Sequence, residues 1–293
     1  MGISLNPQHL KRYRQIAWLL LKYGGSDLVK QTGLNETLEA EQRVTPKEAA
    51  KAEELADDLE KLGPTFVKLG QLLSTRIELM PQAYIEALTR LQDKVEPFGF
   101  GEVEQIVSSE LGVRIAKAFS EFESKPTASA SLGQVHLARL RDGKPVAVKV
   151  QRPNIREAVL SDLDALYELA ELLDRHTEFG KRYQFRQMLE EFRKSLLREL
   201  DYRLEAQNLI TFHANMEKFP RIIVPLPIDD YCTARVLTME YVPGKKITDM
   251  SPLARMEFDG EALAEEVFRA YLEQILVHGF FHADPHPGNV FIT

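Results

Sequence analysis

The sequence predicts an α+β protein, because stretches with strand character stand between long stretches with helical spacing of apolar residues. The expected strands are residues 119–122, 133–140, 145–151, 222–226 and 234–241. The expected helices are residues 64–73, 156–177, 183–216 and 260–278, with a further helix beginning at Pro81. An order of helices, then a hairpin-rich region interrupted by helices, then another helix favours α+β over an alternating parallel sheet.

Turn and capping residues set the limits of several of these elements. Asp142-Gly143 lies between two expected strands and is a strong hairpin signal. Gly63-Pro64 interrupts the helical pattern and places a proline at the first position of the next helix. Gly279 is expected to close the helix that precedes it.

Composition places the chain among globular proteins with a sizeable core. It has 293 residues, of which 44% are apolar and 28% are charged. The net charge of −7 argues against a general nucleic-acid binder, so nucleic acid is not an expected partner. The single cysteine, Cys232, excludes an internal disulfide and a cysteine zinc site, which favours a reducing compartment such as the cytoplasm.

Residues 11–22 form a basic amphipathic stretch. They contain four basic residues and no acidic ones, interleaved with Tyr13, Trp18 and leucines. One interpretation is a helix that binds a membrane surface or a partner. The other is a helix whose apolar face covers the main core, and we favour it because such helices are far more common.

Residues 128–135 have the spacing of the glycine-rich loop of kinases, with alanine in the first two glycine positions. Ala128, Ala130, Gly133 and Val135 match the pattern G-x-G-x-x-G-x-V. Lys149 follows in a V-A-V-K segment that matches the kinase strand V-A-I-K. Such a loop covers nucleotide phosphates with backbone N–H groups, and the lysine ammonium meets the α- and β-phosphates.

Residues 282–289 match the kinase catalytic-loop pattern H-x-D-x-x-x-x-N. Asp284 would orient the attacking hydroxyl or water and accept its proton. Asn289 would hold a Mg²⁺ ion through its amide oxygen. His282 and His286 are interpreted as structural residues, since the kinase spacing explains the segment better than a metal site does.

Two further segments offer candidate binding residues. A kinase needs a helical carboxylate to pair with its strand lysine, and Glu199, Asp201 and Glu205 are all candidates. The backbone groups of Glu240 and Val242 follow a strand and would hydrogen-bond an adenine edge. By itself this second pattern is weak, because many strand-to-turn segments look similar.

Together these motifs resemble the UbiB family of atypical kinases, which are linked to ubiquinone biosynthesis. Two features distinguish that family from ordinary kinases, namely the alanine-rich loop and a K-x-G-Q motif, here residues 68–71. The family's E-x-D motif matches residues 199–201. The resemblance covers about residues 61–293, and the motifs appear in the family's order.

The resemblance implies specific roles for these residues. Lys149 and Glu205 would form the kinase ion pair. Lys68 would reach the two E-x-D carboxylates, and Gln71 would lie over the nucleotide. The implied architecture is a protein-kinase-like N-lobe with an antiparallel sheet and inserted helices, preceded by a helical extension. The implied segments are residues 1–60 (extension), 61–112 (K-x-G-Q helical layer), 113–244 (N-lobe) and 245–293 (start of the C-lobe).

The resemblance also implies a function that uses ATP and Mg²⁺. The K-x-G-Q layer would occupy the place where a protein substrate docks, which favours ATP hydrolysis or a small, lipid-like substrate such as a quinone precursor. The expected location is the cytoplasm, at the surface of the inner membrane. Two alternatives stay open: a nucleotide-binding pseudokinase that regulates a lipid or protein complex, and a small-molecule phosphotransferase of the aminoglycoside-kinase type.

The end of the sequence leads to one more expectation. The chain stops four residues after Asn289, inside the apolar run 290–292 and before any D-F-G segment. We therefore expect a piece of a longer protein with an incomplete C-lobe, and the lack of a second Mg²⁺ ligand would leave it inactive alone.

Overall fold

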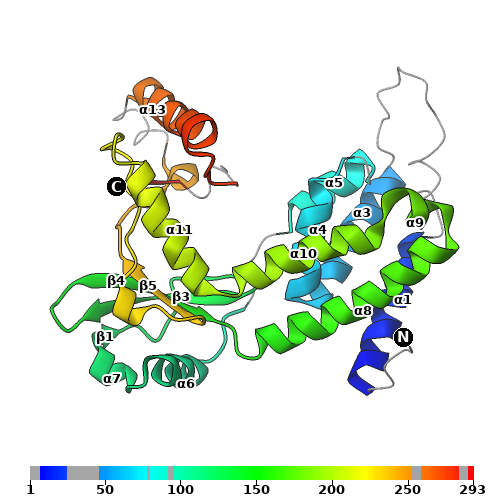
Figure 1. The fold of residues 1–293 in the computed structure, drawn as a ribbon, viewed down its shortest axis with the longest axis horizontal. Coiled ribbons are helices and arrows are strands. Elements are labelled where there is room, and N and C mark those ends of the chain that lie inside the picture. Colours follow the sequence, from blue (N-terminus) through cyan, green and yellow to red (C-terminus); the bar gives the residue numbers. More distant parts are fainter. Residues whose placement is uncertain (1–6, 25–45, 78–79, 92–95, 252–258, 284–289) are drawn as a thin grey trace. The chain divides into compact units, whose positions relative to one another are not determined.

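Helices, a five-stranded β-sheet and a second, two-stranded sheet form the part of the chain that the computed structural model describes (Figure 1). The described residues are 7–24, 46–77, 80–91, 96–251, 259–283 and 290–293. Their contacts form two compact units. Unit 1 comprises Met1–Pro97, Ser129–Gly133 and Gln151–Leu200, and unit 2 comprises Phe98–Ala128, Gln134–Val150 and Asp201–Thr293. Each unit is assembled from separate stretches of chain, whereas the four segments predicted from the sequence are continuous, and that division stays a prediction.

Unit 1 is helical. Its helices are α1 (Pro7–Gly24), α3 (Pro46–Leu62), α4 (Pro64–Ser74), α5 (Gln82–Thr89), α8 (Ile155–His176), α9 (Glu178–Tyr183) and α10 (Phe185–Glu199). All of them except α9 contribute to one apolar core, and α8 and α10 run side by side (Figure 1). The predicted starts at Gly63-Pro64 and Pro81 are confirmed, since Gly63 has φ 103° as the N-cap of α4 and Pro81 is the N-cap of α5.

Helix α1 turns charged groups inward as well as apolar ones. Ile16 and Tyr23 are buried in the unit 1 core. Arg12 donates from Nη2 to Asp162 Oδ2 on α8 at 2.8 Å, and Lys22 donates to Asp58 Oδ2 on α3 at 2.7 Å. These contacts favour the interpretation of residues 11–22 as a helix that covers the core.

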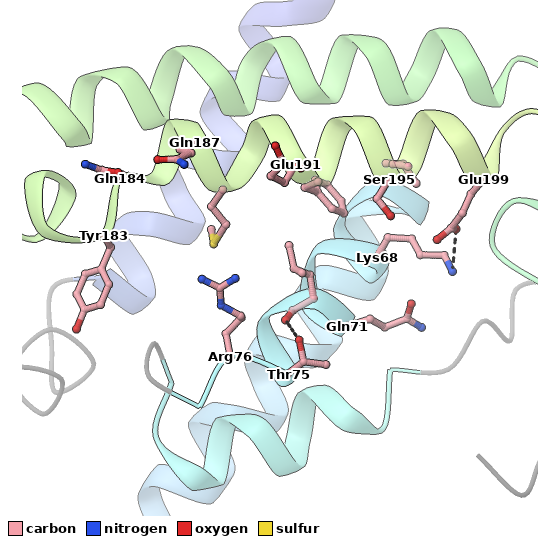
Figure 2. Close-up of a pocket in the computed structure, with 14 residues that line it drawn as sticks. Lys68, Gln71, Thr75, Arg76, Tyr183, Gln184, Gln187, Glu191, Ser195 and Glu199 are labelled. Carbon is pink, nitrogen blue, oxygen red and sulfur yellow. Dashed lines mark hydrogen bonds and ion pairs between the residues drawn. The ribbon is translucent and has the colours of Figure 1, made fainter. Parts of the chain in front are cut away.

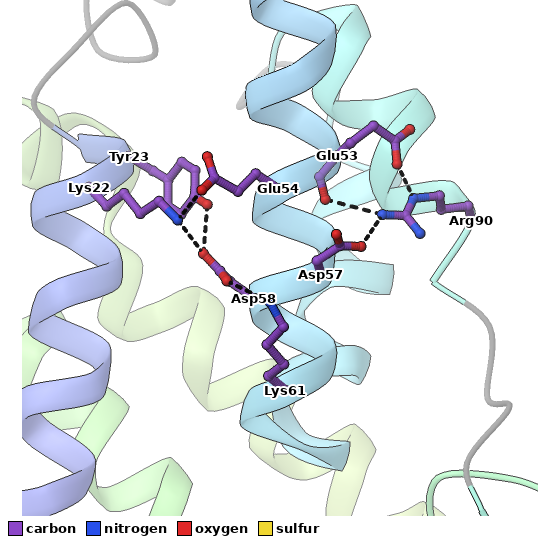
Figure 3. Close-up of polar contacts among 8 residues, drawn as sticks. All are labelled: Lys22, Tyr23, Glu53, Glu54, Asp57, Asp58, Lys61 and Arg90. Carbon is purple, nitrogen blue, oxygen red and sulfur yellow. Dashed lines mark hydrogen bonds and ion pairs between the residues drawn. The ribbon is translucent and has the colours of Figure 1, made fainter.

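Acidic residues of α3 connect it to its neighbours (Figure 3). Asp58 is buried and also accepts a 2.8 Å hydrogen bond from the Tyr23 hydroxyl. Burial would raise the pKa of Asp58, but the hydrogen bonds from Lys22 and Tyr23 outweigh it and hold the pKa below its usual value. On the other side of α3, Arg90 contacts Asp57 at 2.6 Å. Helix α3 is thereby oriented by ion pairs on two sides.

Unit 2 contains the five-stranded sheet, except for the strand-end residues Ser129, Gly133 and Gln151, which belong to unit 1. Its strands are β1 (Phe119–Phe122), β2 (Ala128–Ser129), β3 (Gly133–Leu140), β4 (Pro145–Gln151) and β5 (Val236–Glu240), in the order β1-β3-β4-β5 with β2 beside β3. The pairs β1–β3 and β4–β5 are antiparallel. Gly143 has φ 90° in the turn between β3 and β4, as a tight Asp-Gly turn requires. The predicted strands 119–122, 133–140 and 145–151 are confirmed.

Two helices of unit 2 pack against opposite faces of β4. Alternation along the strand places Val146, Val148 and Val150 in a core with α6 (Phe100–Leu111). Lys149 points to the other face, where its partner in the register is Leu237 of β5. Leu237 packs with α11 (Tyr202–Asn215). The face that carries Lys149 is therefore covered by the helix that carries Glu205.

The remaining elements of unit 2 are short or lie near the end of the sequence. They are α7 (Ile115–Ala118), two 3₁₀ turns (Asp229–Tyr231 and Ile247–Asp249), β6 (Lys245–Lys246), α13 (Gly260–Glu273), a π-helical turn (Gln274–His278) and β7 (Phe291–Ile292), which pairs with β6. Gly279, with φ 60°, ends the π-helical turn as predicted. Among the described helices, none is both long enough and apolar enough to cross a bilayer.

Two sequence predictions were wrong. Residues 183–216 are not one helix, because α10 ends at Glu199 and α11 begins at Tyr202. The Gln151 side chain donates to the Leu200 carbonyl at 3.0 Å, and Asp201 caps α11 by accepting from the Arg203 N–H. Residues 222–226 do not form a strand, since Pro225 and Pro227 offer no N–H, and only an isolated bridge from Pro227 to Met239 forms there.

Gly70, in the K-x-G-Q motif, lies where α4 packs closely on α3 and α5. A Cβ atom there would overlap Leu91 Cδ1 and would lie 3.1 Å from Leu59 Cδ1 and 3.4 Å from Leu88 Cδ2. We predict that Gly70→Ala lowers the free energy of unfolding by about 1–3 kcal/mol through overpacking, despite alanine's better helix propensity. Urea unfolding measures this. Measured in a Leu91→Ala background, Gly70→Ala should cost less than in the parent, because the overlapping side chain is gone. A single Gly70→Ala variant more stable than the parent would contradict the prediction.

Candidate functional site

A lysine–glutamate ion pair joins β4 to α11 in unit 2. Lys149 Nζ lies 2.8 Å from Oε1 and 2.7 Å from Oε2 of Glu205. The side chains are 27% and 38% exposed, so the pair is half-buried. Among the three carboxylates that the sequence left open as partners of the strand lysine, the structure places Glu205 against it.

The start of α11 sets the position of Glu205. Asp201 is the N-cap, and the Tyr202 N–H donates to the Ala234 carbonyl at 3.1 Å. Glu205 follows Tyr202 by three residues, so both side chains lie on one helix face. The buried Tyr202 ring lies below the ammonium, with Lys149 Nζ 4.7 Å from its centroid. The ring and the carboxylate together restrict where the ammonium can lie.

The pair leaves the ammonium able to bind an anion. A lysine ammonium has three N–H donors, and two are directed at the Glu205 oxygens. Its compact charge suits a phosphate oxygen, and its partial exposure leaves it accessible. In the part of the chain that the structure describes, no group of three His, Cys, Asp or Glu side chains could hold a metal ion.

The alanine-rich loop folds back on itself. The Thr127 N–H donates to the Val135 carbonyl at 2.8 Å, and the Ala130 N–H donates to the Gly133 carbonyl at 2.8 Å. Ala128 is exposed, whereas Gly133 is buried. The Ala130 N–H is therefore engaged within the loop, so a phosphate would have to compete with the Gly133 carbonyl for it.

The end of β5 carries the predicted adenine-binding segment. The Glu240 N–H donates to the Leu226 carbonyl at 2.9 Å. The Glu240 carboxylate accepts from Lys144 at 2.8 Å, and this bond lowers the pKa of Glu240 below its usual value. Val242 follows outside regular secondary structure and is half-buried. An adenine edge would thus meet the carbonyl of Glu240 and not its N–H.

The K-x-G-Q motif lies in unit 1 and contacts one end of the E-x-D motif. Lys68 Nζ on α4 is 3.2 Å from Glu199 Oε2 on α10. The Gln71 amide donates to the Leu91 carbonyl at 2.9 Å. Asp201 belongs to unit 2, where Arg203 contacts both of its carboxylate oxygens at 2.9 and 2.8 Å. A contact of Lys68 with Asp201, and a place for Gln71 over a nucleotide, stay predictions.

A pocket of about 750 Å³ lies between α4 and the α9–α10 segment (Figure 2). Lys68 and Glu199 lie at one end, and Arg76, Tyr183 and Gln184 lie at the other (Figure 2). Its apolar lining residues are Leu72, Met188, Phe192 and Leu196, and its other polar lining residues are Gln71, Thr75, Gln187, Glu191 and Ser195. The volume is within the range of small-molecule sites.

The predicted catalytic-loop residues Asp284 and Asn289 lie outside the described residues, so their roles stay predictions. The chain that leads into this loop is anchored to the π-helical turn. The Phe280 N–H donates to the Gln274 carbonyl at 3.2 Å, and the His282 N–H donates to the Gln274 side-chain oxygen at 3.0 Å.

Several residues of the two sites were not predicted from the sequence. Tyr202, beneath the Lys149 ammonium, could have been predicted, since it precedes Glu205 by three residues in a predicted helix. The same holds for Arg203, which contacts Asp201 from the same predicted helix. Arg76, just after α4, and Gln187, on α10, line the pocket, but no pattern in the sequence indicates that these two segments lie together.

Comparisons with known proteins agree with the motifs. The sequence model of the ABC1 atypical kinase-like domain matches residues 90–293. An uncharacterized Synechocystis protein, sll1770, is 40% identical over 86% of this chain. The Arabidopsis thaliana protein named ACTIVITY OF BC1 COMPLEX KINASE 7, chloroplastic, is 43% identical over 81%. A protein of Pectobacterium carotovorum named Probable protein kinase UbiB is 37% identical over 99%. The predicted resemblance is confirmed.

The chain spans only part of these relatives: 43% of the Synechocystis protein, 34% of the Arabidopsis protein and 54% of the Pectobacterium protein. It also resembles the solved structure of Rv3197 from Mycobacterium tuberculosis in complex with erythromycin. That likeness has a TM-score of 0.54 at 29% identity and covers 82% of this chain and 60% of the other. With the domain match, it confirms the predicted kinase-like α+β architecture.

The Lys68–Glu199 pair is predicted to contribute little to stability. The Glu199 side chain is 45% exposed, and exposed ion pairs contribute at most about 1 kcal/mol to the free energy of unfolding. In a double-mutant cycle with Lys68→Met and Glu199→Gln, urea unfolding should give a coupling energy below about 1 kcal/mol. A coupling several times larger would show that the pair is a structural clamp.

Proposed function

Because the chain belongs to the ABC1 atypical kinase-like family, we propose that it binds ATP with Mg²⁺ and acts as an atypical kinase or ATPase. The observation that carries this proposal is the half-buried ion pair of Lys149 and Glu205. A lysine inside an apolar strand usually needs no partner, because it can extend to solvent. Here Glu205 on α11, 56 residues later in the sequence, places its Oε2 atom 2.7 Å from Lys149 Nζ and holds the ammonium against the sheet.

In the proposed reaction, Lys149 binds the α- and β-phosphates, and Glu205 and the Tyr202 ring keep its ammonium in place. Asp284 orients the attacking hydroxyl or water and accepts its proton. Asn289 would hold Mg²⁺ through its amide oxygen, a ligand type that suits this ion. When bound, Mg²⁺ neutralises charge on the phosphate oxygens.

The adenine would be held at the end of β5. The Glu240 carbonyl would accept from the exocyclic amine, since the Glu240 N–H already donates to Leu226. The Val242 N–H would donate to a ring nitrogen. The Glu240 carboxylate is charged and accepts a hydrogen bond from Lys144. The adenine would therefore bind to the backbone of this segment and not to the Glu240 side chain.

We propose a small or lipid-like substrate in preference to a polypeptide. The pocket between α4 and α10 supports this, because about 750 Å³ with apolar and amide groups fits a small molecule. The relatives named Probable protein kinase UbiB favour a role in ubiquinone synthesis, with a quinone precursor as ligand. The proposed location is the cytoplasmic surface of the inner membrane.

Nucleotide binding and turnover test the proposal in the full-length protein. We predict that Mg-ATP raises the melting temperature more than ATP alone does. Lys149→Met should lower phosphate release about 10²-fold, and Glu205→Gln about tenfold. Lys218→Met, which removes an exposed lysine–glutamate pair elsewhere in unit 2, should leave release unchanged.

Three results would redirect the proposal. Mg-ATP binding without phosphate release would favour a pseudokinase that regulates a lipid or protein complex. Phosphorylation of an added aminoglycoside would favour the small-molecule phosphotransferase. Phosphate release that persists in Asp284→Asn would remove the proposed base.

The alanine loop generates a separate prediction. Alanine restricts positive φ, and the Ala130 N–H is engaged by the Gly133 carbonyl. Ala130→Gly or Ala128→Gly should let the loop adopt other conformations and change both the affinity for Mg-ATP and the rate of hydrolysis. Calorimetry and a phosphate-release assay measure the two quantities. If neither changes, the alanines do not control nucleotide binding.

A further inference from the structure

Two polar side chains are fully buried on β3, next to the alanine loop. Gln134 is 1% exposed and His136 is 0% exposed, and both lie on the strand face that packs on the unit 2 core. Burying polar groups without partners is unfavourable, so such side chains are expected to be hydrogen-bonded. Two apolar side chains could fill the same space without needing hydrogen-bond partners. The partners of Gln134 and His136 therefore indicate what the two polar side chains do.

The two side chains link three separate segments. The Phe98 N–H donates to Gln134 Oε1 at 2.9 Å, and Gln134 Nε2 donates to the Phe98 carbonyl at 3.2 Å. Gln134 Nε2 also lies 2.9 Å from His136 Nε2, and His136 Nδ1 lies 2.8 Å from the Glu123 carbonyl. Since the Gln134 amide is the donor, His136 Nε2 accepts, and the proton on Nδ1 is donated to Glu123.

The bond to Glu123 falls on the chain that enters the loop. Glu123 follows β1, and its N–H donates to the Leu137 carbonyl at 2.9 Å. Four residues later, the Thr127 N–H donates to the Val135 carbonyl at 2.8 Å. His136 therefore holds the incoming arm of the loop against β3, which is the outgoing arm, while Gln134 fixes β3 to Phe98.

We propose that His136 and Gln134 are positioning residues for the nucleotide-binding loop 128–133, and that His136 acts through its neutral Nδ1–H form on the Glu123 carbonyl. The role in nucleotide binding rests on the proposed function. The hydrogen bonds themselves do not, since they are formed between protein groups. Neither residue contacts the reacting atoms in this proposal.

The surroundings of His136 keep its ring neutral. The rings of Phe100 on α6 and Phe122 on β1 lie 6.1 and 5.4 Å from it, and the Glu123 carboxylate is the charged group that acts on it. Burial lowers the pKa of His136 below its ordinary value despite Glu123. Protonation would turn Nε2 into a donor facing the Gln134 amide, so the connection should break as the pH falls.

Two conservative variants separate the two ring nitrogens. The side-chain amide of His136→Asn can reproduce the Nδ1–H donor to Glu123, whereas that of His136→Gln reaches the position of Nε2 near Gln134. We expect His136→Gln to raise the dissociation constant for Mg-ATP about five- to tenfold, as for loss of one buried hydrogen bond, and His136→Asn to raise it less than about twofold. The control Val107→Ala, in the same core, should lower stability without changing this constant.

Hydrogen exchange of the Thr127 amide gives a readout that needs no nucleotide. It should become about five- to tenfold faster in His136→Gln than in the parent, and change less than about twofold in His136→Asn. As the pH falls below the ordinary histidine pKa of about 6.5, Mg-ATP affinity should fall more in the parent than in His136→Asn, a comparison that cancels titration of the nucleotide.

The outcomes distinguish the two proposals. If the Asn and Gln variants behave alike in exchange, the positioning role is wrong, whatever the protein does with ATP. If exchange follows the predicted order but the parent binds no Mg-ATP, the proposed function fails and the loop constraint stands. If the parent and both variants bind Mg-ATP with the same dissociation constant, His136 does not position the loop for nucleotide binding.

Discussion

The position of one ammonium group depends on most of unit 2. Lys149 faces away from the valine core of β4, and its register with Leu237 places it under α11. The helix must begin at Asp201 for Glu205 to reach it. A lysine with four rotatable bonds has many conformations in solvent, so a fixed charge requires partners on several sides. The carboxylate of Glu205 and the ring of Tyr202 supply them.

Buried polar groups specify geometry in both units. In unit 1, Asp162 and Asp58 receive hydrogen bonds from Arg12 and Lys22 of α1. Replacing such pairs by apolar residues is often neutral or stabilising, so their presence is weak evidence for a gain in stability. Their directional bonds instead restrict α1 to one rotation and one height along α3 and α8. The His136 network restricts the arms of the alanine loop in the same manner.

The strands around the Asp142-Gly143 turn could be predicted to the residue, since turn chemistry and apolar alternation agree there. The break between α10 and α11 could not, because the apolar pattern runs through it and the Leu200 carbonyl is held by Gln151 from a distant strand. Residues 222–226 were misassigned because β-branched residues outweighed the prolines around them. In the site, motif spacing identified Lys149 and Glu205, but the pocket residues depend on which helices pack together.

Because neither unit is a continuous stretch, the chain passes from one to the other five times, at 97/98, 128/129, 133/134, 150/151 and 200/201. During synthesis, α3, α4 and α5 emerge long before α8 and α10, which complete the core they share. These three helices pack on one another, but the apolar surface that α8 and α10 will cover stays exposed while most of the sheet is being made. Nascent chains shorter than about 200 residues should therefore depend on chaperones, and no simple truncation can release either unit as a folded fragment.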